Sequence, residues 1–260
     1  MFNKNKINYE ALRTTADSIF SGTYYIDFLS FREEQGRIKG GRRNVEAALI
    51  LGASESTGST KQKNVEEQEK LLIDYACKSG IWIDESSFKI TDQIAEESEA
   101  TVYYLPKKGV VRKVVNYRRF SKTPLDHLTN RISLHNYLFP ETEYELVGFT
   151  NTQDFTGNKT FAFVVEQPFV KGKYIDFTRE EGLFRKESKK RGFNYDLENY
   201  KPLLFNDDYV IKDLHEENII VDNQGSFFFI DTVPALNTPD SGFHGTREYG
   251  NGGLIGKSYI

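Results

Sequence analysis

The stretch that most constrains the fold is residues 210–234, VIKDLHEENIIVDNQGSFFFIDTVP. Its two apolar runs, residues 219–221 and 226–230, are separated by DNQG, whose Asp, Asn and Gly favour a tight turn. The pattern predicts a β-hairpin. Asp213 and Asn218 lie on the loop before the first run, and the hairpin would return Asp231 toward them.

These residue types at this spacing fit phosphoryl transfer from ATP. That reaction needs a carboxylate to orient or deprotonate an acceptor hydroxyl, and oxygen ligands to hold Mg²⁺ on the phosphates. Asp213, Asn218 and Asp231 would supply these groups. The alternative is a hairpin with ordinary turn carboxylates, because Asp and Asn are common in turns of any protein.

The same stretch resembles the protein kinase superfamily, whose catalytic loop reads H-R-D-x-x-x-x-N and whose metal-binding loop reads D-F-G. Here IKD stands at the first motif and DTV at the second, and the form D-L-H-x-x-N is similar to that of aminoglycoside and choline kinases. The resemblance implies that Asp213 is the catalytic base and that Asn218 and Asp231 are metal ligands. It places His215 where protein kinases carry a phosphate-facing lysine.

Residues 88–234 also resemble the minimal kinase domain of polyvalent proteins from phages and other mobile elements. The phrases SEATVYYL, RISLHNYLFPETEYELVGF, VVEQPFV and DLHEENIIVDNQGSFFFID carry this likeness. It implies an ATP- and Mg²⁺-dependent kinase, with a protein or a small molecule as the hydroxyl acceptor. Two other functions stay open: a pseudokinase that binds nucleotide without turnover, and an interaction module of a mobile element.

The upstream pattern predicts an α+β fold with the two lobes of a protein kinase, a truncated C-lobe and an extra, mostly helical N-terminal segment. A helix is expected after Asn64, ending at Gly80, and another at residues 124–138. Strands are expected from short β-branched and aromatic runs, and a polar helical region follows Gly172. The strands are residues 88–94, 100–105, 110–117, 144–150 and 160–166, and the helical region extends to about residue 204.

Three further positions are expected around the nucleotide. Alternation puts Val111, Lys113 and Val115 on one face of their strand, so Lys113 is the candidate to hold phosphates. Residues 124–138 contain no Glu to pair with it, and Asn130 or Asn136 is a possible neutral partner. Glu166 begins a polar, Pro-containing connector that could face adenine, whereas the loop at residues 94–100 is acidic rather than Gly-rich.

The sequence predicts three parts. Residues 1–85 form an N-terminal segment with a helix at 9–20 and a linker at 52–63. Residues 86–240 form the kinase-like domain, and residues 241–260 form a Gly-rich tail.

The composition indicates which partners and which cell compartment to expect. A net charge of −4 gives no overall attraction to nucleic acid. A single cysteine excludes an internal disulfide, and no apolar run approaches the roughly 18 residues of a membrane span. These features predict a soluble, cytoplasmic protein.

Overall fold

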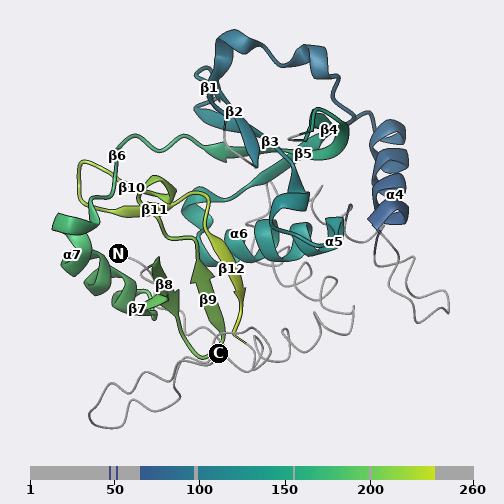
Figure 1. Cartoon of the computed structure of the whole chain (residues 1–260). Helices are drawn as coiled ribbons and strands as arrows, with labels where there is room; N and C mark the ends of the chain where they lie inside the picture. The colour runs from purple at the N-terminus through teal and green to yellow at the C-terminus, as the bar shows by residue number, and fades with distance from the viewer. Residues whose placement is uncertain are drawn as a thin grey trace, which may run out of the picture.

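The computed structural model describes residues 47, 51, 65–96, 99–154, 156–198 and 201–237 (Figure 1). This part of the chain is α+β, as expected, with three antiparallel sheets. The helices are α4 (Val65–Lys78), α5 (Pro124–Asp126), α6 (Leu134–Leu138) and α7 (Phe177–Lys190). The strands are β1 (Gln93–Glu96), β2 (Ala100–Leu105), β3 (Val110–Val115), β4 (Glu145–Gln153), β5 (Lys159–Pro168), β6 (Lys173–Tyr174), β7 (Asn194–Glu198), β8 (Lys201–Phe205), β9 (Tyr209–Lys212), β10 (Ile219–Val221), β11 (Phe227–Phe229) and β12 (Val233–Leu236).

Three expectations fall on residues that the structure does not describe. They are the helix at residues 9–20, the linker at 52–63 and the tail at 241–260. In the described residues, no helix is both long and apolar enough to cross a membrane.

The first sheet has the strand order β1-β2-β3-β5-β4, and every neighbouring pair is antiparallel. In its register Lys113 lies opposite Val102 on one side and Val165 on the other. The strands predicted at residues 100–105, 110–117, 144–150 and 160–166 are confirmed, although β4 and β5 extend further than the apolar runs suggested and β3 ends at Val115, before a 3₁₀ turn at Tyr117–Arg119.

The strand predicted at residues 88–94 is wrong for most of its length. Asp84 accepts a hydrogen bond from the backbone N–H of Ser86 at 2.8 Å, which starts a short 3₁₀ turn, and a second turn follows at Ile90–Asp92. Phe88 packs its ring on Tyr103 with centroids 5.3 Å apart. Phe88 therefore packs on a face of the sheet, whereas Ile90 is exposed, and only β1 joins the sheet edge.

The helix predicted at residues 124–138 is confirmed, but its middle is a π-helical segment, His127–Ser133. Thr123 caps the start by accepting from the N–H of Asp126 at 3.1 Å, with Pro124 at the first helical position. Within the segment, Ser133 donates its hydroxyl to the Leu128 carbonyl at 2.8 Å. A π segment changes which side chains face inward, and such segments are frequent at functional sites.

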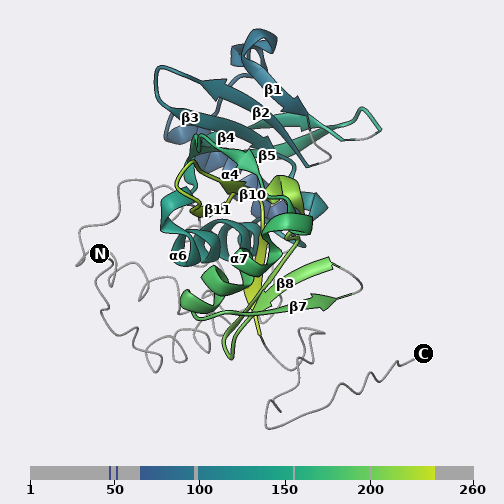
Figure 2. The ribbon, with the colours of Figure 1, turned by 90° about the vertical axis from the view of Figure 1, so that its left-hand side faces the viewer.

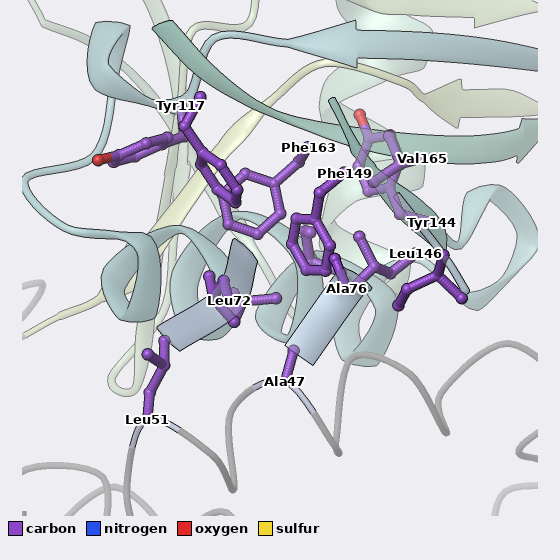
Figure 3. Packing of buried hydrophobic residues seen from close by; sticks show 14 residues of the cluster. Ala47, Leu51, Leu72, Ala76, Tyr117, Tyr144, Leu146, Phe149, Phe163 and Val165 are labelled. Atoms are coloured by element: carbon purple, nitrogen blue, oxygen red, sulfur yellow. The ribbon is translucent and has the colours of Figure 1, made fainter. Parts of the chain in front are cut away.

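A first hydrophobic cluster joins α4 to the first sheet and to the helix that begins at Pro124 (Figure 3). Leu72 and Ala76 of α4 point toward the rings of Phe149 and Phe163, and Leu128 is fully buried beside them. Although α4 belongs to the N-terminal segment expected from the sequence, it completes the core of the first sheet.

A second cluster lies among α6, α7 and the later strands. Both later sheets contribute residues to it, the sheet of order β11-β10-β6 and the sheet of order β12-β9-β8-β7. In Figures 1 and 2 these two sheets lie below the first sheet. The β10–β11 hairpin has the predicted pairing, with Ile219 opposite Phe229 and Val221 opposite Phe227.

The helical region predicted after Gly172 and up to residue 204 is confirmed only for α7; it is wrong at its start, where β6 forms, and beyond Arg191. Gly192 has φ +88°, a left-handed conformation that ends α7, and the Phe193 N–H bonds back to the Ser188 carbonyl at 3.0 Å. The β7–β8 hairpin follows, and it buries Leu203 and Leu204.

Candidate active site

Four strand ends bring the sequence-predicted residues together. Asp213 follows the last residue of β9, and Asp231 lies just before β12, which pairs with β9 so that Lys212 is opposite Val233. Asn218 directly precedes β10. Because β10 and β11 pair in register, the hairpin returns the chain from Asn218 to Asp231. The site therefore lies where the two later sheets meet.

Asn218 is the link between the two predicted acidic residues. Its buried side-chain Nδ2 donates to the Asp213 carbonyl at 2.8 Å, to Asp213 Oδ2 at 3.2 Å and to the Asp231 carbonyl at 3.3 Å. All three partners are pure acceptors, so they fix the orientation of the amide. Its other end, Oδ1, is an oxygen acceptor, the kind of atom that hard cations prefer.

Asp213 has φ +59°, the left-handed region, which aspartate tolerates better than most residues because its short side chain bonds locally. About a third of the side chain, 32%, is exposed. His215, with 51% exposed, has its Nε2 4.0 Å from Asp213 Oδ1. An acceptor arriving from solvent could therefore reach the Asp213 carboxylate.

Lys113 meets Asp231. Its Nζ lies 2.7 Å from Oδ1 and 2.6 Å from Oδ2, with only 5% and 13% of the two side chains exposed. Burial alone would raise the pKa of the Asp231 carboxyl. The positive charge and hydrogen bonds of Lys113, with a hydrogen bond from Tyr144, outweigh burial and hold that pKa below its usual value.

The partners proposed for Lys113 within the helix are engaged elsewhere. Asn130 donates to Asp126 Oδ1 at 2.6 Å, and Asn136 bonds to the backbone of Tyr144. The helix instead contributes Arg131, whose Nη1 donates to the Thr232 carbonyl at 3.0 Å and whose Nη2 lies 3.6 Å from Glu99 Oε1. The helix therefore contributes a cation, Arg131, to the side of the site where the kinase pattern would have a Glu paired with Lys113.

The backbone that carries Asp231 is held by side chains from elsewhere in the chain. Four consecutive carbonyls, from residue 229 to residue 232, each accept at least one side-chain hydrogen bond. The donors are Thr142 to Phe229 at 2.6 Å, Tyr144 and Gln167 to Ile230, Asn218 to Asp231, and Arg131 to Thr232. Buried carbonyls that are all bonded fix the position of the loop.

Residues 65–238 match the sequence model of a family described as Serine/Threonine/Tyrosine Kinase found in polyvalent proteins. The chain belongs to this kinase family. It matches none of the curated proteins or solved structures with which it was compared. The family assignment makes the chain a kinase-like phosphotransferase, and it agrees with the resemblance seen in the sequence.

Glu166, expected to face the nucleotide, has its side chain on the other face of the sheet from Lys113. Its neighbour Val165 lies opposite Lys113, so alternation turns Glu166 outward. There it bonds to Arg112 and to Lys108, the latter at 3.1 Å. Burial would raise the pKa of Glu166, but these two cations lower it overall. The Glu166 backbone lies between two strands, opposite Arg112 of β3 and Glu145 of β4.

The residues present fit a magnesium nucleotide. The described residues include no cluster of three or more His, Cys, Asp or Glu that could hold a metal alone. A metal bound mainly through phosphates needs only one or two protein ligands, and Asp231 and Asn218 Oδ1 are suitable hard oxygen donors. The buried hydroxyl of Thr232, which has no partner among the described residues, lines a cavity of about 30 Å³ beside Lys113 and Arg131. A water molecule bonded to the site would satisfy it.

A cavity of about 610 Å³ lies away from this chemistry. It is lined by residues such as Asn116, Asp154 and Lys159. Arg118 at its wall is paired with Glu69 at 2.8 Å. Because it contains none of the candidate catalytic residues, volume alone does not locate the active site here.

Proposed function

We propose that the chain transfers a phosphoryl group from ATP to a hydroxyl acceptor with Mg²⁺ as cofactor. The observation that carries this proposal is the Asn218 amide, which bonds to both Asp213 and Asp231 and whose oxygen accepts no hydrogen bond seen within the described residues. An asparagine of an ordinary turn bonds within its own turn, whereas Asn218 also joins its loop to the backbone that carries Asp231. We also propose that the first and second hydrophobic clusters correspond to two kinase-like lobes.

The residues would divide the work by their surroundings. When bound, ATP would supply the phosphoryl group and Mg²⁺ would neutralise the charge of its phosphates. Asp231 and the Asn218 oxygen would hold the metal, and Lys113 would leave Asp231 to bind phosphate oxygens. Asp213, open to solvent, would orient the acceptor hydroxyl and take its proton. The proposal covers two classes of hydroxyl acceptor, a protein side chain and a small molecule.

The test is label transfer from radiolabelled ATP in the presence of Mg²⁺. We expect transfer by the wild type and a loss of at least about 100-fold in Asp213→Asn, since general bases contribute on that order. Nucleotide binding, measured by calorimetry, should survive in Asp213→Asn. It should lose its Mg²⁺ dependence in Asp231→Asn.

Asp222→Asn is the matched control. Asp222 lies in the turn of the same hairpin, where it accepts from the N–H groups of Gln224 and Ser226, and asparagine keeps that role. Equal transfer by Asp213→Asn and Asp222→Asn would contradict the catalytic role of Asp213. Binding of ATP with Mg²⁺ but no transfer by the wild type would favour the pseudokinase alternative.

A further inference from the structure

Tyr144 is the side chain that contacts both members of the Asp231–Lys113 pair. It lies just before β4, and its hydroxyl is 2.9 Å from Asp231 Oδ1 and bonds to the Ile230 carbonyl. Lys113 Nζ lies 5.5 Å from the centre of its ring, within range of a cation–π interaction. Neither the spacing of the motifs nor the family match assigns this residue a role.

The position of Tyr144 is itself fixed from two sides. Asn136 of α6 accepts from the Tyr144 N–H at 2.6 Å and donates to the Tyr144 carbonyl at 2.8 Å. The ring packs on His135 with centroids 4.7 Å apart. A tyrosine held by its backbone and by its ring can direct its hydroxyl with little conformational freedom.

The hydroxyl has one hydrogen, which its two acceptors share. A tyrosine hydroxyl keeps its hydrogen at neutral pH, so the group serves as a donor to Asp231 Oδ1 and to the Ile230 carbonyl. We expect Tyr144 to stay beside Asp231 when Lys113 moves to a phosphate, because Asn136 and His135 hold it independently of Lys113.

We propose that Tyr144 is the positioning residue that holds the Asp231 carboxylate in the orientation that binds Mg²⁺. This inference rests on the proposed function, since it names the group that prepares its metal ligand. Hydrogen-bond partners of metal-binding carboxylates fix their orientation, and their loss typically lowers metal affinity or activity about 10- to 100-fold.

Tyr144→Phe removes the hydroxyl and keeps the ring that packs on His135 and faces Lys113. Tyr117→Phe is the matched control, because Tyr117 is a buried tyrosine whose hydroxyl bonds to a carboxylate, Glu69, in the first cluster. The measurement is the Mg²⁺ concentration that gives half of the maximal ATP binding, by calorimetry, with thermal unfolding recorded for each variant.

We expect that Mg²⁺ concentration to rise about tenfold or more in Tyr144→Phe and to stay unchanged in Tyr117→Phe. ATP affinity measured without metal should be the same in both, which general loosening of the fold would not give. Gln167→Met is a second variant. It removes a donor from the Ile230 carbonyl and leaves the contacts of the Asp231 carboxylate in place, so its shift should be much smaller.

The outcomes separate the two proposals. Equal Mg²⁺ curves for Tyr144→Phe and Tyr117→Phe, with the wild type binding ATP in a Mg²⁺-dependent way, would overturn the role of Tyr144 and leave the proposed function standing. A shift as large in Gln167→Met as in Tyr144→Phe would assign the effect to the loop rather than to the carboxylate. Absence of Mg²⁺-dependent binding in the wild type would overturn the proposed function and this inference together.

Discussion

Asp213 and Asp231, the two carboxylates of the candidate site, lie on opposite sides of Asn218 in contrasting surroundings. Asp231 is nearly buried and is bonded by Lys113 and Tyr144. Asp213 is open to solvent, and of the described side chains only Asn218 hydrogen-bonds its carboxylate. The contrast suits a division of labour, because a metal ligand needs a fixed orientation and a base needs access to its substrate.

The same contrast predicts how the two loops contribute to stability. A buried carboxylate paired with a buried lysine is costly to disturb, whereas an open carboxylate can be replaced with little loss. The predictions below follow from this difference, measured as the free energy of unfolding.

The largest expected effect is that of Asp231→Asn. It leaves the Lys113 ammonium buried without its counter-charge, and breaking such a pair costs about 3–5 kcal/mol. Denaturant unfolding measures the loss. Glu187→Gln, which breaks the exposed pair with Lys190, is the control and should cost about 0.5 kcal/mol or less. The double variant Asp231→Asn with Lys113→Met should recover much of the loss, and a failure to recover would mean that the pair is not the cause.

A second effect is the pH dependence contributed by two buried histidines. Burial, the largest cause, lowers the pKa of His127 and of His135 to about 3. Since an unfolded histidine has a pKa of about 6.5, the unfolded state binds more protons between these values. The contribution of each neutral histidine to the free energy of unfolding is therefore fully present above about pH 6.5. It is lost as the pH falls below that value, by up to about 1.4 kcal/mol per pH unit for each imidazole.

His135 connects this effect to the Asp231 side of the site. Its Nε2 lies 3.1 Å from the Thr142 carbonyl, and Thr142 bonds to the backbone of Phe229. The free energy of unfolding, measured with urea at several pH values between 7 and 5, should fall less steeply with decreasing pH in His135→Gln than in the wild type. The same is expected, independently, for His127→Gln. An unchanged slope in both variants would contradict the buried, neutral state of these rings.

A smaller effect is expected at the Asp213 backbone. Because φ is +59°, Asp213→Ala should be less stable than Asp213→Asn by about 1 kcal/mol, as alanine tolerates the left-handed region less well than asparagine. Comparison of the two variants by denaturant unfolding removes the effect of the lost charge, which both share. Equal stabilities would show that this loop relaxes to an ordinary conformation.

The smallest effect is expected for His215→Ala. Half of the side chain is exposed, and its Nε2 is 4.0 Å from Asp213, so the free energy of unfolding should change by less than about 0.5 kcal/mol. A loss of more than about 1 kcal/mol would mean that the Asp213 loop is held more firmly than its contacts indicate.

The hairpin and its polar residues could be predicted because their signal is local. Two apolar runs around a DNQG turn specify the pairing, and the residues at its ends are then close in space. The resemblance to the protein kinase superfamily also came from this stretch, whereas the likeness to the polyvalent-protein kinases drew on three further phrases upstream. Lys113 could be placed on the correct face by alternation, but its partner Asp231 is 118 positions away and no local pattern indicates such a contact.

The errors have physical causes as well. Residues 194–198, NYDLE, alternate weakly and are as polar as the helix before them, so only the left-handed Gly192 marks the change to strand. Gln167 and Arg131 gave no signal because each bonds to a backbone carbonyl of residues 230–232, and any sequence offers a carbonyl. Tyr144 gave none because Asp231, whose carboxylate it contacts, is 87 positions away. Such side chains are recognised only when the fold is known.

The pairing of Lys212 with Val233 has a consequence for how the site assembles. The chain leaves the sheet at Asp213 and re-enters it after Thr232, so the proposed base and both proposed metal ligands lie in one closed segment of twenty residues. Closing a loop of that size costs about 1.6 kcal/mol less in chain entropy than closing the 118-residue separation to Lys113. We expect the acidic half of the site to form early in folding and the lysine to join it last.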